Sequence, residues 1–186
     1  MRFNKHTKLE GLHAFLGASK YSWVNYDDEK LIESWNKQKA QQLGTELHDF
    51  AARAIKLGIK LQETNQTLNL YINDAIGFGM EPEVILKPDF IHYCFGTADA
   101  ISFKKNKLRI HDLKTGVTPA KFTQLQIYAA LYCMEYDVHP NDIEIELRIY
   151  QNDECYVEIP ESDDILYIMA KIKRFDNIIK EMQGGY

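Results

Sequence analysis

Apolar and polar positions follow two different periods along the chain, and the shorter period predicts strands in the central part. Residues 143–150 alternate strictly between apolar and polar side chains, which predicts a strand with one solvated face. Residues 95–103 and 108–113 are rich in β-favouring residues and flank a polar turn at 104–107, which predicts a hairpin. Shorter apolar runs predict further strands at 83–87 and 155–159.

The longer period predicts helices on either side of these strands. Residues 41–61 carry apolar side chains every three or four positions, as a helix with one buried face requires. Pro119 is expected to open a helix that runs to about Tyr136, and Ser162 or Asp163 is expected to cap a last helix. Further helices are predicted after an N-cap at Asn25 or Asp27 and over residues 65–78. This order of elements predicts an α/β fold, with a mixed central sheet and helices on both faces.

Length and charge limit the classes of function. With 186 residues, of which 45% are hydrophobic, the chain is expected to fold as one domain with a sizeable core. We divide it into an N-terminal helical segment at 1–43, a core at 44–160 and a C-terminal helix at 161–186. The net charge of −5 gives no general affinity for nucleic acid, so a polyanion would need a local basic patch or a bound metal ion.

The cysteines indicate a reducing compartment. Cys94, Cys133 and Cys155 are far apart in the sequence and form no CxxC pair. In the absence of a secretory signal or an apolar run of membrane-spanning length, they predict a cytoplasmic protein that is not attached to a membrane. Three thiols cannot supply a four-cysteine site, so we expect no iron–sulfur cluster.

Two carboxylates and a lysine are expected to meet at the end of the predicted hairpin. Alternation puts Asp112 and Lys114 on one face of the second strand, and a hairpin register can bring Asp99 beside Asp112. Carboxylate oxygens suit Mg²⁺ or Mn²⁺, and such a metal can activate water and stabilise charge on a phosphoryl group. A lone Asp-x-Lys tripeptide is most often a surface ion pair, so that interpretation stays open.

Two helices carry further candidate residues. Gly44 lies inside a predicted helix, where it costs about 1 kcal/mol relative to Ala, so it indicates a close approach of another segment. His48, four residues later, is most simply a helix-surface histidine. Gln124 and Tyr128 share one face of the helix that follows the Asp-x-Lys strand, so they can face the same site, although a solvated Gln and a half-buried Tyr are the simpler interpretation.

Four short motifs occur in a fixed order along the chain. They are Gly-Thr-x-x-His at 44–48, Gly-x-x-Asp at 96–99, Asp-x-Lys-Thr-Gly at 112–116 and Gln-x-x-x-Tyr at 124–128. Together they resemble the nuclease motifs of the PD-(D/E)XK superfamily, in the RecB-type exonuclease branch, with similar motifs in CRISPR-adaptation nucleases and phage exonucleases. The resemblance implies a restriction-endonuclease-like core, and the small size is compatible with a phage-encoded member.

The resemblance also implies a role for each matching residue. His48, Asp99, Asp112 and the Leu113 carbonyl would bind Mg²⁺ or Mn²⁺, and Lys114 would be the catalytic lysine together with the two aspartates. Gln124 and Tyr128 would approach the DNA and the site. Ala98 stands where many relatives have Pro. Glu83 is a further candidate ligand, although a solvated glutamate at a strand end is the simpler interpretation.

We therefore expect a metal-dependent deoxyribonuclease that hydrolyses phosphodiester bonds, with exonuclease action favoured. DNA is the expected partner, together with a recombination, replication or defence-related protein in a bacterial or phage-infected cell. The alternatives are a non-catalytic DNA-binding, protein-binding or inhibitor protein on a nuclease scaffold, and cleavage of RNA. Candidate substrate contacts are Lys20, Tyr21, Lys104, Lys105, Lys107 and Lys121; a solvated turn explains the lysines at 104–107 equally well.

Overall fold

The structure, a computed structural model, describes residues 4–184. The chain groups into two compact units that divide between Leu43 and Gly44. The expectation that the whole chain forms one nuclease domain stays a prediction.

The N-terminal unit contains two 3-10 helices, η1 (Thr7–Leu9) and η2 (Ala18–Asn25), and the first part of helix α1 (Asp28–Leu57). The Asp27 carboxylate accepts a hydrogen bond of 2.7 Å from the Lys30 backbone N–H. This contact satisfies one of the free N–H groups at the start of α1, so the predicted cap at Asp27 is confirmed. The second part of this longer helix corresponds to the helix predicted at 41–61, but it ends at Leu57 and residues 58–61 are not helical.

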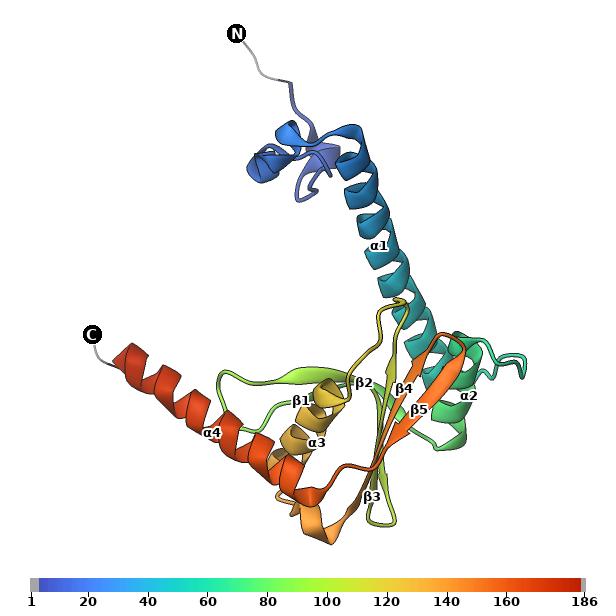
Figure 1. The fold of residues 1–186 in the computed structure, drawn as a ribbon, viewed down its shortest axis with the longest axis vertical. Helices are drawn as coiled ribbons and strands as arrows, with labels where there is room; N and C mark the ends of the chain where they lie inside the picture. Colours follow the sequence, from blue (N-terminus) through green and yellow to red (C-terminus); the bar gives the residue numbers. More distant parts are fainter. Residues whose placement is uncertain (1–3, 185–186) are drawn as a thin grey trace. The chain divides into compact units, whose positions relative to one another are not determined.

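The larger unit is built on one five-stranded sheet (Figure 1). Its strands follow the sequence in the order β1 (Glu81–Leu86), β2 (Gly96–Lys104), β3 (Lys107–Leu113), β4 (Glu144–Gln151) and β5 (Glu154–Glu158). All neighbouring strands are antiparallel except β3 and β4, which are parallel. The predicted hairpin is confirmed: Lys105 and Asn106, with φ of 52° and 58°, form its two-residue turn, as the twist of paired strands favours.

Helices cover both faces of the sheet. Helix α2 (Thr67–Gly77) and the end of α1 pack on one face, around buried residues such as Ile72 and Leu113. Helices α3 (Thr123–Glu135) and α4 (Ser162–Gly184) pack together on the other face, where Leu125 and Leu147 are fully buried. The predicted α/β class, with a mixed sheet between helices, is confirmed. The finer expectation of a restriction-endonuclease-like core stays a prediction.

The start of α3 was predicted wrongly. The helix begins at Thr123, and Pro119 lies in the preceding loop. The Gln151 side chain binds this loop, because its Oε1 accepts from the Ala120 N–H at 3.1 Å and its amide donates to the carbonyls of Thr118 and Gly116. A partner distant in the sequence therefore holds the backbone of this segment as a loop.

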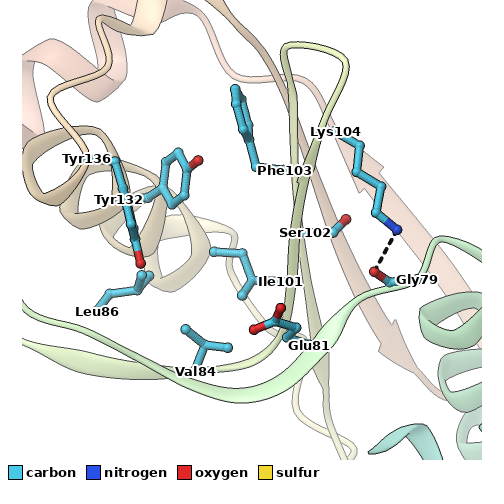
Figure 2. A pocket seen from close by; sticks show the side chains of 10 residues that line it. All are labelled: Gly79, Glu81, Val84, Leu86, Ile101, Ser102, Phe103, Lys104, Tyr132 and Tyr136. Atoms are coloured by element: carbon cyan, nitrogen blue, oxygen red, sulfur yellow. Dashed lines mark hydrogen bonds between the residues drawn. The ribbon is translucent and has the colours of Figure 1, made fainter.

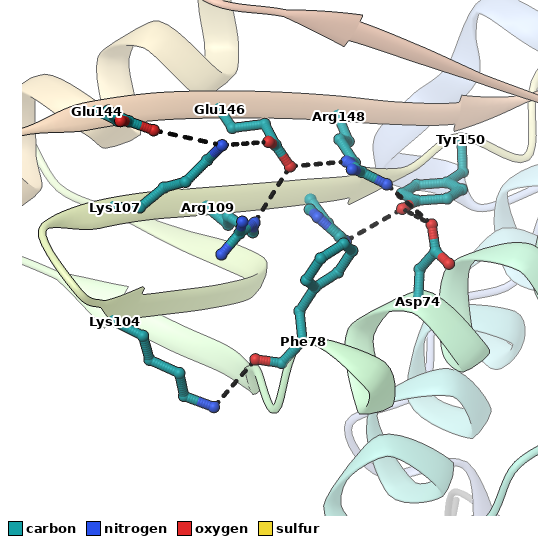
Figure 3. Close-up of polar contacts among 10 residues, drawn as sticks. Asp74, Phe78, Lys104, Lys107, Arg109, Glu144, Glu146, Arg148 and Tyr150 are labelled. Carbon is teal, nitrogen blue, oxygen red and sulfur yellow. Dashed lines mark hydrogen bonds and ion pairs between the residues drawn. The ribbon is translucent and has the colours of Figure 1, made fainter.

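The solvated face predicted for β4 is also wrong. Glu146 on this face is bound by Lys107, Arg109 and Arg148 at 2.8–3.2 Å, and its side chain is only 9% exposed (Figure 3). The two arginines lie over the Phe78 ring at 4.6 and 4.7 Å from its centroid. Glu146 and Arg148 thus form a largely covered ion network, while Glu144 at the start of β4 stays exposed. Alternation alone does not distinguish such a network from a solvated face.

Candidate metal centre

The hairpin brings Asp99 and Asp112 together at one end of the sheet. The β2–β3 register pairs Ala100 with His111, so the next positions along the two strands are Asp99 and Asp112. The Asp99 carboxylate accepts a hydrogen bond of 2.9 Å from the Leu113 N–H. This bond replaces a backbone pairing where the two strands separate, and it fixes the Asp99 carboxylate next to β3.

Lys114 connects the strand end to helix α3. Its ammonium group lies 3.0 and 2.9 Å from the two carboxylate oxygens of Asp112, on the face that alternation predicted. It also donates to Gln124 Oε1 at 2.9 Å, and the Gln124 amide donates to the Tyr128 hydroxyl at 2.9 Å. The predicted shared face of α3 is therefore turned toward this site, and two contacts hold the ammonium group in place.

Two glycines of the motifs permit close approaches. A Cβ atom on Gly44 would lie 2.9 Å from Thr115 Oγ1, so the close approach predicted at this position is confirmed. A Cβ atom on Gly96 would lie 2.7 Å from Cε1 of the Tyr128 ring. Real Cβ contacts this short are essentially absent from proteins. Gly96 therefore lets Tyr128 lie against β2.

His48 and Glu83 complete a group of possible ligands with Asp99. His48 Nδ1 lies 3.4 Å from Asp99 Oδ2, and one ligand atom from each of the three residues lies within 4.8 Å of the others. Glu83 stands opposite Asp99 in the β1–β2 register, because the pairs on either side are Pro82–Ala100 and Val84–Ala98. Glu83 is exposed, as a solvated strand-end glutamate would be, and its role as a ligand stays a prediction that the strand register supports.

The backbone at Glu83 supports a functional interpretation. Its φ of 54° lies in the left-handed region, which costs a non-glycine residue free energy. Such conformations gather at functional sites, where the surrounding structure imposes them. Here the unusual backbone accompanies a carboxylate next to His48 and Asp99.

Burial makes the two aspartates difficult to ionise. Burial raises the pKa of Asp99, and the charge of Asp112 raises it further, to about 6, although His48 and the Leu113 N–H act in the opposite direction. Burial also raises the pKa of Asp112, and Lys114 counters this effect. Adjacent buried carboxylates are stabilised in their charged form by a cation, and shifts of this kind mark candidate functional sites.

The donor set fits a small divalent metal ion. Carboxylate oxygens are the usual ligands of Mg²⁺, and an imidazole nitrogen adds affinity for Mn²⁺. His48, Glu83 and Asp99 would supply three ligands, and Asp112 adjoins Asp99. The Leu113 side chain is buried in the core, and its N–H donates to Asp99. These contacts do not involve the Leu113 carbonyl, and its role as a metal ligand stays a prediction.

The lysines predicted as substrate contacts differ in whether their ammonium groups already bind protein atoms. Lys104 donates to the carbonyls of Phe78 and Gly79 at 3.0 and 2.8 Å (Figures 2 and 3), and Lys107 pairs with Glu144 and Glu146. These protein contacts disfavour both as phosphate ligands. Exposed side chains are present at Lys105, Lys121, Lys20 and Tyr21, the last two in the N-terminal unit.

A separate cavity of about 260 Å³ lies where β1 begins and β2 ends (Figure 2). Apolar and tyrosine side chains form much of its wall, among them Val84, Ile101 and Tyr132, and Glu81 is the one carboxylate in its lining. It lacks the group of ligands found around Asp99, so we do not assign the metal centre to it.

Comparison of the chain with protein-family models, with curated proteins and with solved structures finds no match in any of the three. No helix in residues 4–184 combines the length and the apolar character needed to cross a membrane. The expected cytoplasmic location stays a prediction.

Proposed function

We propose that the protein is a Mg²⁺- or Mn²⁺-dependent DNA nuclease of the PD-(D/E)XK type, with exonuclease action favoured. One observation carries the proposal: the Lys114 ammonium group is held between Asp112 and Gln124, beside a group of candidate metal ligands in which His48 and Asp99 are half-buried and Glu83 is exposed. A simple surface ion pair would not require an ammonium group with two fixed partners beside candidate metal ligands. Phosphodiester hydrolysis uses both the metal ligands and a positioned ammonium group.

The chain's own residues supply binding and orientation. His48, Glu83 and Asp99, with Asp112, would hold the metal, which when bound supplies Lewis-acid activation of water and offsets charge at phosphorus. Lys114, fixed by its two partners, would orient the attacking water and stabilise negative charge on the phosphoryl oxygens. Gln124 and Tyr128 would keep the ammonium group in this position and approach the DNA backbone.

Cleavage of end-labelled linear DNA and of closed circular DNA, each with Mn²⁺ and with EDTA, tests the proposal. We expect cleavage of the linear substrate with Mn²⁺ only, and little cleavage of the circle if action starts at an end. Lys114→Ala should lower the single-turnover rate by about 10²-fold or more and keep Mn²⁺ binding, because an ammonium group cannot bind a metal. Lys60→Ala, an exposed lysine outside the site, is the matched control.

Two results would overturn the assignment. Cleavage by Lys114→Ala at the wild-type rate would show that Lys114 is not a catalytic residue. No cleavage of linear DNA, single-stranded DNA or RNA by the wild type with Mn²⁺ would instead favour a non-catalytic binding protein on this scaffold.

A further inference from the structure

The N-terminal unit contains a cavity of about 460 Å³ that the proposed nuclease site does not use. Its volume lies within the range of small-molecule sites, roughly 300–1,000 Å³. The wall combines basic, aromatic, hydroxyl and amide side chains. The lining residues that the argument uses are Phe15, Lys20, Ser22, Trp23, Tyr26 and Lys37.

Positive charge is concentrated at this cavity. No aspartate or glutamate lines it, although the unit contains acidic residues elsewhere, namely Glu10, Asp27, Asp28, Glu29 and Glu33. Within residues 4–184, the ammonium groups of Lys20 and Lys37 form no ion pair or hydrogen bond, whereas Lys30 pairs with Glu33 at 2.7 Å. Lys30 and, more weakly, Lys37 lower the pKa of Glu33, but the ammonium groups of Lys20 and Lys37 make no direct contact with a carboxylate in the described residues and are available to an anionic ligand.

Aromatic rings with fixed positions line the same cavity. The indole N–H of Trp23 donates to the Gly17 carbonyl at 3.0 Å, which sets the orientation of the ring. Phe15 packs edge-on against Trp35 with 5.0 Å between ring centroids. Trp23, Tyr26 and Phe15 are half-buried, and the contacts above hold the rings of Trp23 and Phe15 in place.

We propose that this cavity binds a segment of single-stranded nucleic acid. Lys20 and Lys37 contact phosphates, and an unpaired base stacks on Trp23, since positive charge along the backbone and aromatic faces for the bases are the shared features of single-strand sites. A duplex fits this chemistry poorly because its base faces are covered. This inference rests on the proposed function. The cavity chemistry alone fits any anion with an aromatic ring, and the proposed nuclease activity is the reason for choosing a nucleic acid.

Tryptophan fluorescence provides a direct test. The chain has two tryptophans, so Trp35→Phe leaves Trp23 as the single reporter in the full-length protein. We titrate this protein with a 5′-phosphorylated dT hexamer in EDTA, where metal-dependent cleavage does not interfere. A stacked base should quench Trp23 saturably, and an rU hexamer in a parallel titration compares RNA with DNA.

Charge-matched variants separate the cavity from general electrostatics. Lys20→Gln/Lys37→Gln should weaken hexamer binding at least tenfold and reduce the slope of log K against log salt by about 1.4, since each phosphate contact on a single strand contributes about 0.7. Lys5→Gln/Lys8→Gln removes the same charge from the same unit outside the cavity lining. This control should bind like the parent protein.

Three results would overturn the inference: no saturable quenching, equal weakening by the two double variants, or equally tight binding of a fully paired DNA hairpin that is long enough to form a stable stem. The nuclease proposal can fail separately. Saturable binding without Mn²⁺-dependent cleavage would reject the nuclease and keep this site, whereas cleavage of DNA without a Trp23 response would reject this site alone.

Discussion

Replacing Glu146 with Gln should destabilise the fold strongly, although the residue lies outside the proposed site. Glu146 is the carboxylate that Lys107, Arg109 and Arg148 share on the covered face of β4 (Figure 3). Lys107 also pairs with Glu144 at 3.5 Å, and Arg148 also pairs with Asp74 at 3.1 Å. Glutamine keeps the shape of the side chain and removes its charge. The three half-buried cations would then lose the carboxylate that they share, and Arg109 would keep no other carboxylate partner among the described residues. Loss of one partner from a buried ion pair is costly.

The size of the effect follows from the pKa of Glu146. Burial acts to raise this pKa, but the Lys107 hydrogen bond and the charges of Arg148 and Arg109 outweigh burial and lower it from 4.5 to about 2. Each pKa unit corresponds to about 1.4 kcal/mol, so ionised Glu146 contributes about 3 kcal/mol to the free energy of unfolding at pH 7. Because the folded-state pKa is the lower one, this stability is present above pH 4.5 and is lost as the pH falls toward 2.

Urea unfolding of the wild type and Glu146→Gln at pH 7 and pH 4 measures this contribution. The variant should lose about 3 kcal/mol at pH 7, and the loss should be about 1 kcal/mol smaller at pH 4. Glu144→Gln is the matched control, because Glu144 approaches the same Lys107 at 3.5 Å with a side chain that is 78% exposed. We expect the control to lose less than about 0.5 kcal/mol. Equal losses in the two variants would refute the reasoning.

Three further predictions concern the site and its surroundings. Gly96→Ala should lower the free energy of unfolding by about 1–3 kcal/mol, because the added methyl group overlaps the Tyr128 ring; an unchanged urea midpoint would contradict this contact. Burial lowers the pKa of His111 to about 3, so the unfolded chain takes up a proton near pH 6.5 that the folded chain does not. The wild type in EDTA should therefore lose about 2 kcal/mol of stability between pH 7 and pH 5 relative to His111→Phe, and parallel pH curves would contradict a buried neutral imidazole. His48→Ala should reduce Mn²⁺-supported cleavage more than Mg²⁺-supported cleavage, because nitrogen ligands favour Mn²⁺; equal losses would make His48 structural.

Local signals in the sequence predicted which segments form strands and turns more reliably than they predicted what packs against each strand. The hairpin was predictable because a polar turn separates two β-favouring runs, and the turn at Lys105 and Asn106 formed as expected. The solvated face of β4 was wrong because alternation records polarity and not what covers it, and here Phe78 and two arginines do. The start of α3 was wrong because Gln151, distant in the sequence, binds the loop around Pro119.

The candidate site shows the same limit. Alternation within one strand was enough to pair Lys114 with Asp112, and helical spacing was enough to direct Gln124 toward them. The sequence indicated Glu83 only as a further candidate ligand, because its place beside Asp99 depends on how β1 pairs with β2 and on a left-handed backbone. The periodicity of the sequence cannot predict the position of a residue that depends on how two separate strands pair.

The hydrogen bond from the Leu113 N–H gives the Asp99 carboxylate a structural task that is separate from its proposed role at a metal. Leu113 is 1% exposed, so deleting its acceptor would leave a buried N–H unpaired, at about 1–3 kcal/mol. A chain with this fold and no catalysis would still be under pressure to keep an acceptor at position 99, whereas no backbone group requires the ammonium group at position 114. Retention of Asp99 among related chains would therefore be weak evidence for the proposed activity, and retention of Lys114 together with Gln124 would be the better evidence.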